Sequence, residues 1–310
     1  MSIQGRRVVT LSLLAILVAG CSATVSAAPT PLLGSPSPSS SAPGGAAVPA
    51  FAHVYVIVLE NASYASVVGN SEAPYLNGLI SQYGLSTNYF GVAHPSQPNY
   101  LAMFSGSTQG VTDDSPHNLV AANLADQLEA KAKTWRIFAQ DYPGNCYTGS
   151  TKNGQGEGIG SAGTYARKHN PAISFMNISS NPTRCANISN LAGFDPAAAN
   201  FEFIVPNECN DMHSCPISTA DAFLGAFVPG IISSPAFTGS VLFITTDEGE
   251  GSSNGGGQVA TVVVSPLVKA GFRSSVRHDH YSLLRTIEDS WGLACLSQAC
   301  SANDMAEFFK

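Results

Sequence analysis

The sequence predicts an α/β fold in which a mainly parallel β-sheet lies between two layers of helices. Two observations predict it. Five apolar runs rich in β-branched residues indicate buried strands, and between them lie segments in which apolar residues recur at helical spacing. Strands and helices therefore alternate along the chain, and this order is typical of a parallel sheet that is covered on both faces.

The predicted elements follow one another regularly. The strand HVYVIVL, from His53, precedes the helix APYLNGLISQYG and the extended stretch STNYFGVAHP. The helix NLADQLEAKAK precedes the strands WRIFAQ, from Trp135, and FEFIVP, from Phe201. The helix STADAFLGAFVPGII precedes the strands VLFITT, from Val241, and VATVVVS, from Val259, and the helix HYSLLRTIEDSWG closes the pattern. Each helix shows apolar residues three and four positions apart.

The first twenty residues have the features of a secretory signal. Arg6 and Arg7 precede an apolar run that is too short to span a bilayer comfortably, and small residues end the segment. The ending LVAGC, at Cys21, resembles the lipobox of bacterial lipoproteins. We therefore expect residues 1–20 to be a lipoprotein signal peptide and a lipidated Cys21 to hold an exported chain on the outer face of the cytoplasmic membrane. Cleavage within ATVSAAPT is the alternative and would give a soluble secreted protein.

Residues 21–50 are almost all Ser, Ala, Pro and Gly, which cannot bury enough apolar surface to fold, so we expect a disordered tether. Residues 51–310 form the predicted folded domain. Removal of residues 1–20 deletes two arginines and no acid, which changes the net charge from −7 to −9. An acidic surface argues against nucleic acid as a partner, and we expect membrane contact only through the N-terminal lipid.

Six cysteines remain after Cys21, an even number that favours disulfides over metal thiolates in an exported chain. Sequence proximity suggests two pairs and leaves a third, although other connectivities stay open at this level. The expected pairs are Cys209 with Cys215, Cys295 with Cys300, and Cys146 with Cys185.

Polar residues follow three of the predicted strands, where ligands bind in folds of this class. Glu60-Asn61 follows the first, Asn210 to His213 follows FEFIVP, and Asp247-Glu248 follows VLFITT. Carboxylate and amide oxygens suit a hard cation, so we expect one divalent metal ion, with Ca, Mg, Mn and Zn all open. The alternative is that these acids are solvated or cap the next helix. Two such pairs in one sheet favour the metal, because several packed carboxylates without a cation are costly.

The segment HPSQPN places Ser96 between two prolines, near the start of a predicted helix. Unpaired amides and the helix dipole favour an anion there, so this hydroxyl would meet a phosphate. The alternative is a plain helix-capping serine.

Several histidines and basic residues could complete such a site. His213 and His280 could each bind phosphate, donate a proton or ligate a second metal, and each could instead be structural. We expect His278 to be exposed, with an exchange of roles with His280 as the alternative. The cluster Arg167, Lys168 and His169 is either a phosphate clamp or a solvated surface. The segment EGEGSSNGGGQ lacks the lysine of a P-loop and is expected to be a flexible loop, with a lid as one possible role.

Seven short motifs occur in an order and at intervals that resemble the bacterial phosphoesterase family of acid phosphatases and phospholipases C, within the alkaline phosphatase superfamily. They are ENASY, APYLNGL, TNYFGVAHPSQPNYLAMFSG, YARKHNP, PNECNDMH, TTDEGEG and HYSLLRTIED. The resemblance covers about residues 52–293. It implies an alkaline-phosphatase-like three-layer α/β/α sandwich, with residues 51–310 as the catalytic domain.

The resemblance also implies roles for single residues. Ser96 corresponds to the phosphorylated nucleophile, and His213 and His280 fall where the family places histidines around the phosphate. The implied metal ligands are Glu60, Asn61, Asp247, Glu248 and the Ser96 oxygen. The remaining residues expected around the phosphate are Asn99, His94, Arg167, Lys168, His169 and Asp211, the last of which could instead ligate the metal or orient His213. Ala62 and Ser214 depart from the family pattern, which bears on substrate preference.

The function that these observations predict is hydrolysis of phosphomonoesters through a phosphoserine intermediate. The expected substrate is a small-molecule or lipid phosphate ester, and phosphatidylinositol 3-phosphate is one candidate. A phospholipase C-like phosphodiesterase using the same residues is the first alternative. A surface lipoprotein that binds phosphorylated ligands without turnover is the second.

Overall fold

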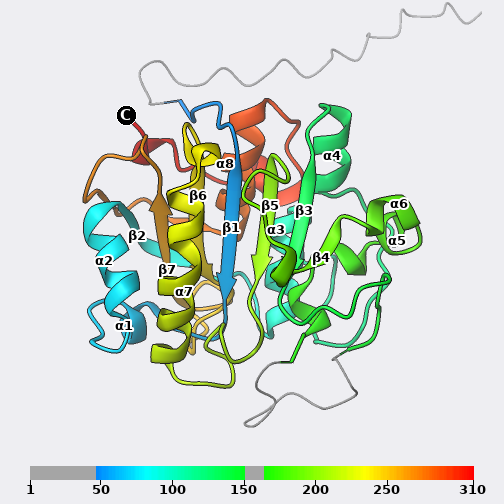
Figure 1. Ribbon diagram of the computed structural model, residues 1–310, viewed down its shortest axis with the longest axis horizontal. Helices are drawn as coiled ribbons and strands as arrows, with labels where there is room; N and C mark the ends of the chain where they lie inside the picture. Colours follow the sequence, from blue (N-terminus) through cyan, green and yellow to red (C-terminus); the bar gives the residue numbers. More distant parts are fainter. Residues whose placement is uncertain (1–46, 151–163) are drawn as a thin grey trace, which may run out of the picture. The chain divides into compact units, whose positions relative to one another are not determined.

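The computed structural model describes residues 47–150 and 164–310 (Figure 1). The predicted signal peptide, Cys21 and most of the predicted tether lie outside the described residues. In the part of the chain that is described, no helix combines the length and the apolar character needed to cross a bilayer.

A single nine-stranded sheet forms the centre of the domain. The strand order is β4-β3-β5-β1-β6-β7-β2-β8, and β9 also pairs with β2. The predicted strands are all present, and the short strands β4, β8 and β9 were not predicted. The bounds are β1 Val54–Leu59, β2 Gly84–Phe90, β3 Trp135–Ala139, β4 Ile188–Asn190, β5 Phe201–Val205, β6 Val241–Thr246, β7 Gln258–Val264, β8 Arg273–Ser274 and β9 His278–Asp279.

The sheet is mostly parallel, with one reversed strand. β4, β3, β5, β1 and β6 are parallel to one another, whereas β7 is antiparallel to both β6 and β2. Parallel strands need a long crossover, usually helical, whereas antiparallel strands accept a short connection. The glycine-rich segment between β6 and β7 contains no helix, and the reversal of β7 follows from that connection.

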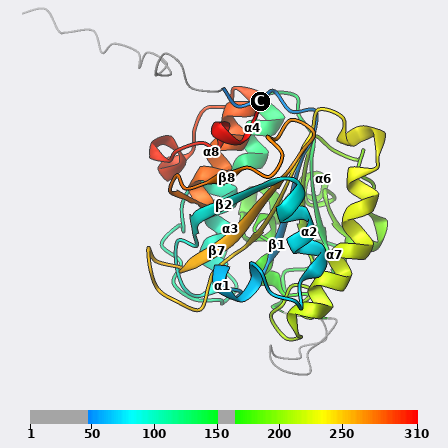
Figure 2. The ribbon, with the colours of Figure 1, turned by 90° about the vertical axis from the view of Figure 1, so that its left-hand side faces the viewer.

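Helices cover both faces of the sheet, as the sequence predicts (Figures 1 and 2). The side chains of β1 alternate between two cores: Val54, Val56 and Val58 belong to one, and the three residues between and after them belong to the other. The first core contains residues of α3 (Ser96–Ser105), α4 (Leu124–Ala130) and α8 (His280–Trp291). The second contains residues of α1 (Tyr64–Val67), α2 (Pro74–Gln82) and α7 (Ile217–Ile232). The three-layer prediction is confirmed.

Shorter elements complete the fold. The helices α5 (Met176–Ser179) and α6 (Pro182–Cys185) lie beside β4 in Figure 1. The 3-10 helices are η2 Arg167–His169, η3 Ala172–Ser174, η4 Leu191–Gly193, η5 Pro235–Phe237, η6 Ser297–Ser301 and η7 Ala306–Phe308.

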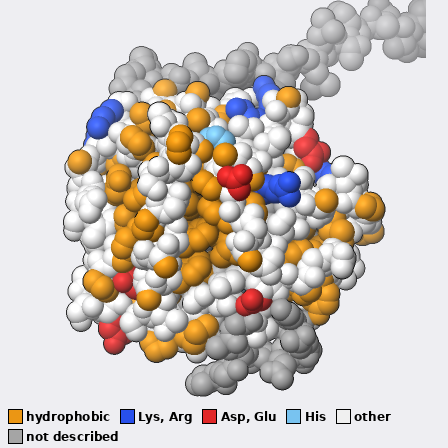
Figure 3. Space-filling model, in the orientation of Figure 1, with side chains coloured by type: hydrophobic (Ala, Val, Ile, Leu, Met, Phe, Trp, Pro, Cys, Tyr) orange, Lys and Arg blue, Asp and Glu red, His pale blue; other side chains and the backbone are white. Residues whose placement is uncertain are grey.

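The three expected disulfides are present and pair as predicted: Cys146–Cys185, Cys209–Cys215 and Cys295–Cys300. On the face shown in Figure 3, Lys and Arg side chains stand in small separate groups, and apolar side chains gather over the region of α2 and α7. This face therefore presents no continuous basic surface.

Candidate active site

Two acidic side chains meet because β1 and β6 are parallel and in register. Leu59 pairs with Thr246, so Glu60 and Asp247 follow directly as neighbours. The Asp247 amide donates to Leu59 O (3.0 Å), and the Asn61 amide donates to Asp247 Oδ1 (3.1 Å). Since the carboxyl ends of parallel strands share one edge of the sheet, this edge concentrates the acids that the sequence places after its strands.

Ser96 is the first residue of the buried helix α3, and Pro95 is its N-cap. Its hydroxyl lies 2.9 Å from Glu60 Oε2 and 3.4 Å from Glu248 Oε1. The serine is 1% exposed. The hydroxyl proton therefore points to a carboxylate, and no side-chain hydrogen bond from Pro95 caps the helix.

The side chain of Asp114, and not that of Ser96, accepts a hydrogen bond from the first turn of α3. The Asp114 Oδ1 atom accepts from the Gln97 amide (2.9 Å), and Asp114 Oδ2 lies 3.2 Å from Lys168 Nζ. A carboxylate is favourable at the positive end of a helix dipole. Asp114 thus satisfies the amide next to Ser96, and sequence analysis did not single it out.

Asn99 braces the loop that leads into Ser96. Its Oδ1 accepts from the amides of Val92 (2.8 Å) and Ala93 (3.1 Å), and its Nδ2 donates to Ala93 O (2.9 Å) and Pro95 O (3.3 Å). The side chain is buried, and both of its polar atoms have backbone partners. In this structure Asn99 shapes the serine loop, whereas the sequence resemblance assigns it to a phosphate oxygen.

The glycine-rich connection packs directly under this loop. The Gly256 amide donates to Gly91 O (3.1 Å), and the Gly91 amide donates to Gly257 O (2.9 Å). A Cβ on Gly91 would lie 2.7 Å from both Asp247 O and Gly256 O, so only glycine permits this approach. The glycines bring the loop that follows β6 against the loop that precedes Ser96.

A stacked tyrosine and histidine, Tyr100 and His169, both contact the Glu60 carboxylate. The Tyr100 hydroxyl donates to Glu60 Oε1 (2.8 Å), and His169 Nε2 lies 3.1 Å from the same oxygen. The two rings stack with centroids 5.0 Å apart and an angle of 12°. Tyr100 lies one helical turn after Ser96, and this spacing of four residues is the signal that could have revealed it.

His169 is held between two buried carboxylates. Its Nδ1 lies 3.4 Å from Asp211 Oδ2, opposite the contact with Glu60. Burial acts to lower the pKa of His169, but the charge of Glu60 and the contacts with both carboxylates outweigh it and raise the pKa to about 10. Burial likewise acts to raise the pKa of Glu60, and the His169 charge overrides it and lowers that pKa to about 2. The two side chains therefore form an ion pair.

The three residues of the predicted basic cluster, Arg167, Lys168 and His169, have different partners in the structure. His169 joins the site, Lys168 pairs with Asp114, and Arg167 turns into the protein, where it donates to His117 O (2.7 Å) and Ser174 Oγ (3.4 Å). Arg167 is 2% exposed. The 3-10 helix η2 points three consecutive side chains in different directions, which a sequence cluster does not reveal.

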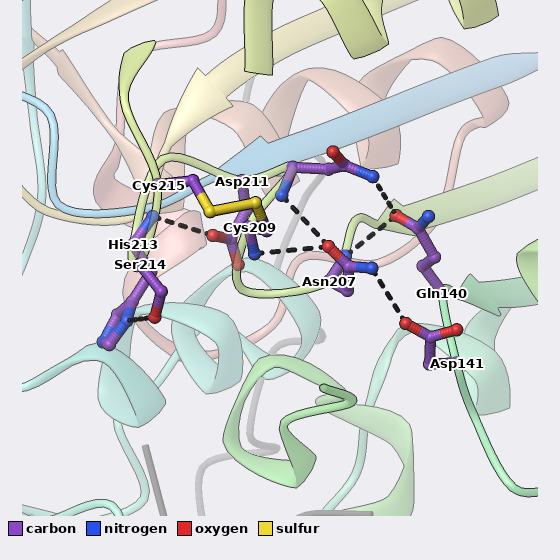
Figure 4. The surroundings of a disulfide bond; sticks show 9 residues. Gln140, Asp141, Asn207, Cys209, Asp211, His213, Ser214 and Cys215 are labelled. Atoms are coloured by element: carbon purple, nitrogen blue, oxygen red, sulfur yellow. Dashed lines mark hydrogen bonds between the residues drawn. A yellow bond between two sulfur atoms is a disulfide. The ribbon is translucent and has the colours of Figure 1, made fainter. Parts of the chain in front are cut away.

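Two predicted histidines lie beside these carboxylates. His94 Nδ1 lies 2.6 Å from Glu248 Oε2, and His94 Nε2 lies 3.1 Å from Gly251 O. His213 is half-buried, and its Nδ1 lies 3.0 Å from Ser214 Oγ (Figure 4). Its ring centroid lies 6.3 Å from that of His169. His94 and His213 are thus the partly exposed imidazoles of the site.

His280 is buried, and both of its ring nitrogens have partners. Nε2 lies against Asp247 O, which can only accept, so Nε2 carries the proton and Nδ1 faces the Tyr89 hydroxyl at 3.2 Å. Burial lowers the pKa of His280 to about 4, so it is neutral near pH 7. Here His280 holds the backbone of Asp247.

The prediction that His278 is exposed is wrong. The side chain is fully buried, with Nδ1 3.2 Å from Ser86 Oγ and Nε2 3.3 Å from Glu307 Oε1. Strand β9 pairs with β2, and the C-terminal segment packs over it. Nothing in the local sequence indicates that a segment almost thirty residues later covers this position.

The acids at this edge repel one another. Burial, followed by the charges of Glu60 and Glu248, raises the pKa of Asp247 well above its ordinary value. Burial, followed by the charge of Glu60, raises the pKa of Glu248 to about 7. Asp247 Oδ2 is buried and has no hydrogen-bond partner. Such a set of oxygens with an unpaired carboxylate atom fits a hard cation.

Residues 47–150 and 164–310 contain no three His, Cys, Asp or Glu side chains already placed as metal ligands. The expected set also draws on a serine hydroxyl and an amide, however, and its donors are hard oxygens. The metal therefore stays a prediction that the chemistry of the donors favours.

The fold of this chain, which places Ser96 beside acidic side chains at one edge of the sheet, also occurs in other solved proteins. Solved structures with the same fold include the lipoteichoic acid synthase LtaP from Listeria monocytogenes (TM-score 0.54, 11% identity, 80% of this chain and 74% of that chain). They also include a protein of the alkaline phosphatase superfamily from Vibrio parahaemolyticus (TM-score 0.52, 11% identity, 83% and 72%). At such identities the likeness shows the fold, which is that of the alkaline phosphatase superfamily.

The chain belongs to the Phosphoesterase family, whose profile matches residues 70–294. It is 34% identical over 265 residues to the phosphatidylinositol-3-phosphatase of Mycobacterium tuberculosis, covering 85% of this chain and 84% of that protein. It is 32% identical over 262 residues to a probable acid phosphatase of Kluyveromyces lactis, covering 80% of this chain and 60% of that one. The protein is thus a hydrolase that acts on phosphoric esters, and it spans somewhat under two thirds of its fungal relative.

Proposed function

We propose that the protein is an exported, metal-dependent phosphomonoesterase that works through a phosphoserine at Ser96. The placement of the Ser96 hydroxyl carries this proposal. It stands at the start of a buried helix, it faces two carboxylates, and the neighbouring amide is already capped by Asp114. A serine that serves only as a helix cap would direct its oxygen to the helix amides instead.

In the first step the Ser96 oxygen attacks phosphorus and its proton passes to the carboxylate of Glu248, because His169 keeps Glu60 ionised. The new Oγ–P bond forms as the bond from phosphorus to the substrate alcohol breaks. We assign the proton for the leaving alkoxide to His213, because His94 is engaged by Glu248 at 2.6 Å. Water then attacks the phosphoserine, which releases phosphate and restores the hydroxyl.

The cation would be held by Glu60, Asn61, Asp247, Glu248 and the Ser96 oxygen, and one ion suits this set. When bound, it would supply Lewis-acid stabilisation of the phosphoryl charge. The chain's own residues keep this set in place: His280 holds the Asp247 backbone, and Tyr100 with His169 holds Glu60.

The substrate class follows from the relatives. The mycobacterial relative is a phosphatidylinositol-3-phosphatase and the fungal relative a probable acid phosphatase, so phosphomonoesters of small molecules or lipids are the proposed substrates. Export and a lipid anchor at Cys21 rest on the signal-like first twenty residues. The three disulfides support an oxidising compartment.

The test is release of phosphate from an aryl phosphate, with and without a chelator, and with the matching diester alongside. Ser96→Ala should abolish hydrolysis. Ser105→Ala is the matched control, because Ser105 is also buried on α3 but bonds the backbone oxygens of Leu101 and Ser107 and the side chain of Gln109, and no acid of the site. Preference for the diester would move the proposal to the phosphodiesterase, and an active Ser96→Ala variant would contradict the covalent mechanism. Tight phosphate binding without turnover would indicate the binding lipoprotein.

A further inference from the structure

The Cys209–Cys215 disulfide closes a short loop that carries two residues of the site. The two cysteines are six positions apart, and their Cα atoms are 4.7 Å apart. The loop contains the buried Asp211 and the half-buried His213. Figure 4 shows the disulfide beside Asp211, with the His213 side chain extending away from it toward Ser214. The disulfide therefore constrains the backbone of the loop that carries Asp211 and His213.

Asp211 is the point at which this loop meets the site. Its carbonyl oxygen accepts from the Glu60 amide (2.6 Å), at the end of β1. Its Oδ2 lies 3.4 Å from His169 Nδ1, and its Oδ1 accepts from the His213 amide (2.8 Å). Movement of Asp211 would thus disturb the backbone of Glu60, the His169 ring and the approach of His213 together.

The loop does not have a relaxed backbone. Met212, between the two site residues, has a φ of 85°, in the left-handed region that residues with a side chain rarely adopt. Such a conformation persists only where the surroundings impose it. Constraints at both ends of the loop are therefore needed to keep Asp211 and His213 where they lie.

Hydrogen bonds fix the start of the loop (Figure 4). Asn207 Oδ1 accepts from the amides of Cys209 (3.2 Å) and Asn210 (3.0 Å), and Asn207 Nδ2 donates to Asp141 Oδ2 (2.8 Å). The end of the loop is tied back by the Ser214 amide, which donates to Glu208 O (2.7 Å), and by the disulfide. The disulfide is the covalent part of the closure.

We propose that the Cys209–Cys215 disulfide is a positioning element of the phosphoesterase site, and that its reduction lowers turnover by releasing Asp211 and His213. The inference rests on the proposed function at Ser96. A dithiol reductant would break the S–S bond, deliver two electrons and two protons to the sulfurs, and leave as its own cyclic disulfide. Full activity would then require an oxidising compartment.

The chain contains a matched control. Cys295–Cys300 closes a loop of five positions with a Cα separation of 5.0 Å, after the end of α8. This loop contacts the end of α3 opposite Ser96, where the Gln298 amide donates to Gly106 O (2.9 Å). The stabilisation that a disulfide gives depends on the length of the loop that it closes, so the two bonds should stabilise the fold similarly. Only the first should affect turnover.

The experiment compares the full-chain variants Cys209→Ser/Cys215→Ser and Cys295→Ser/Cys300→Ser, with kcat, KM and Tm measured on an aryl phosphate. We expect kcat to fall about 10- to 100-fold in the first variant and less than about 2-fold in the second, with similar losses in Tm. Equal kcat values in the two variants overturn the inference while the wild type remains active. An inactive wild type overturns the proposed function instead.

If the first variant does not fold, partial reduction of the wild type gives the same test. Thiols are alkylated after graded treatment with dithiothreitol, and each cysteine pair is mapped by mass spectrometry against residual activity. Cys209 and Cys215 are half-buried rather than fully buried. Activity should fall in proportion to alkylation of that pair. Full activity in molecules that are alkylated there contradicts the proposal.

Discussion

The two ends of the central sheet both bury acidic side chains, but they stabilise them in different ways. At the carboxyl end, Glu60 is charged because His169 pairs with it. At the amino end, Glu202 accepts a hydrogen bond from the Ala199 amide and has no cationic partner that outweighs burial, which raises its pKa to about 8. Glu288, in the second half of α8, has its pKa raised by burial to about 7.

The comparison shows which buried carboxyl groups stay ionised in this fold. A buried acid that has no cationic partner takes up a proton, which removes the cost of burying a charge. The acids around Ser96 are too close together for each to do this independently, and one of them is fixed as an anion by His169. When Asp247 and Glu248 are ionised beside Glu60, that end of the sheet holds electrostatic repulsion that a cation could relieve, whereas the other end does not.

The largest expected effect comes from removal of one charge at the carboxyl end. Asp247→Asn should lower kcat/KM at least about 100-fold, since it removes a proposed ligand. The Asn61 amide can still donate to the new side-chain oxygen. Because the substitution relieves repulsion with Glu60 and Glu248, the Tm of the chelated protein should not fall. Retained activity contradicts the ligand role of Asp247, and a clear loss of Tm contradicts the electrostatic repulsion among these acids.

A smaller effect is expected at the start of α3. Asp114→Ala removes the carboxylate from the Gln97 amide, which should cost about 1 kcal/mol of stability and, by loosening the first turn, lower kcat about 10-fold. Asp113→Ala is the control, since Asp113 lies on the same loop and its side chain bonds His117 and the Ser115 amide, while its backbone oxygen, which the substitution keeps, accepts from Gln97 Nε2. Equal kcat values for the two variants would remove Asp114 from the site.

The smallest effect on catalysis is expected at the amino end. Glu202 has a pKa of about 8 in the fold against 4.5 ordinarily, so between these values the folded protein holds a proton that the unfolded chain releases. Stability should therefore decrease as pH rises through this window, with Glu202 contributing at most about 1.4 kcal/mol per pH unit. Glu202→Gln should remove this contribution, flatten the dependence of Tm on pH and leave kcat unchanged. An unaltered pH profile would show that Glu202 is not the group responsible.

Much of this arrangement was predictable from the sequence. The apolar strands and the acids that follow them place Glu60 and Asp247 at one edge, because parallel strands end together. The serine between two prolines at a helix start was likewise visible. The reversal of β7 was not predicted, although the absence of a helical pattern between β6 and β7 was a signal for it.

The remaining features depend on contacts between distant segments. Asp114 reaches Gln97 from a loop seventeen residues later, and no periodic pattern marks it. Arg167 and His169 are two residues apart, yet one serves the protein interior and the other the site. His278 is covered by the C-terminal segment. Side-chain direction and coverage in these cases are set by tertiary packing rather than by local sequence.

The most direct test of the central claim is to trap the covalent intermediate. Protein is mixed with a phosphomonoester that carries a radiolabelled phosphoryl group, quenched in acid within milliseconds to seconds, and digested for peptide mapping. The account predicts label on the peptide that contains Ser96, in the wild type and not in Ser96→Ala, with chase by unlabelled substrate removing it. Turnover without any label on Ser96, at every quench time, would contradict the phosphoserine mechanism.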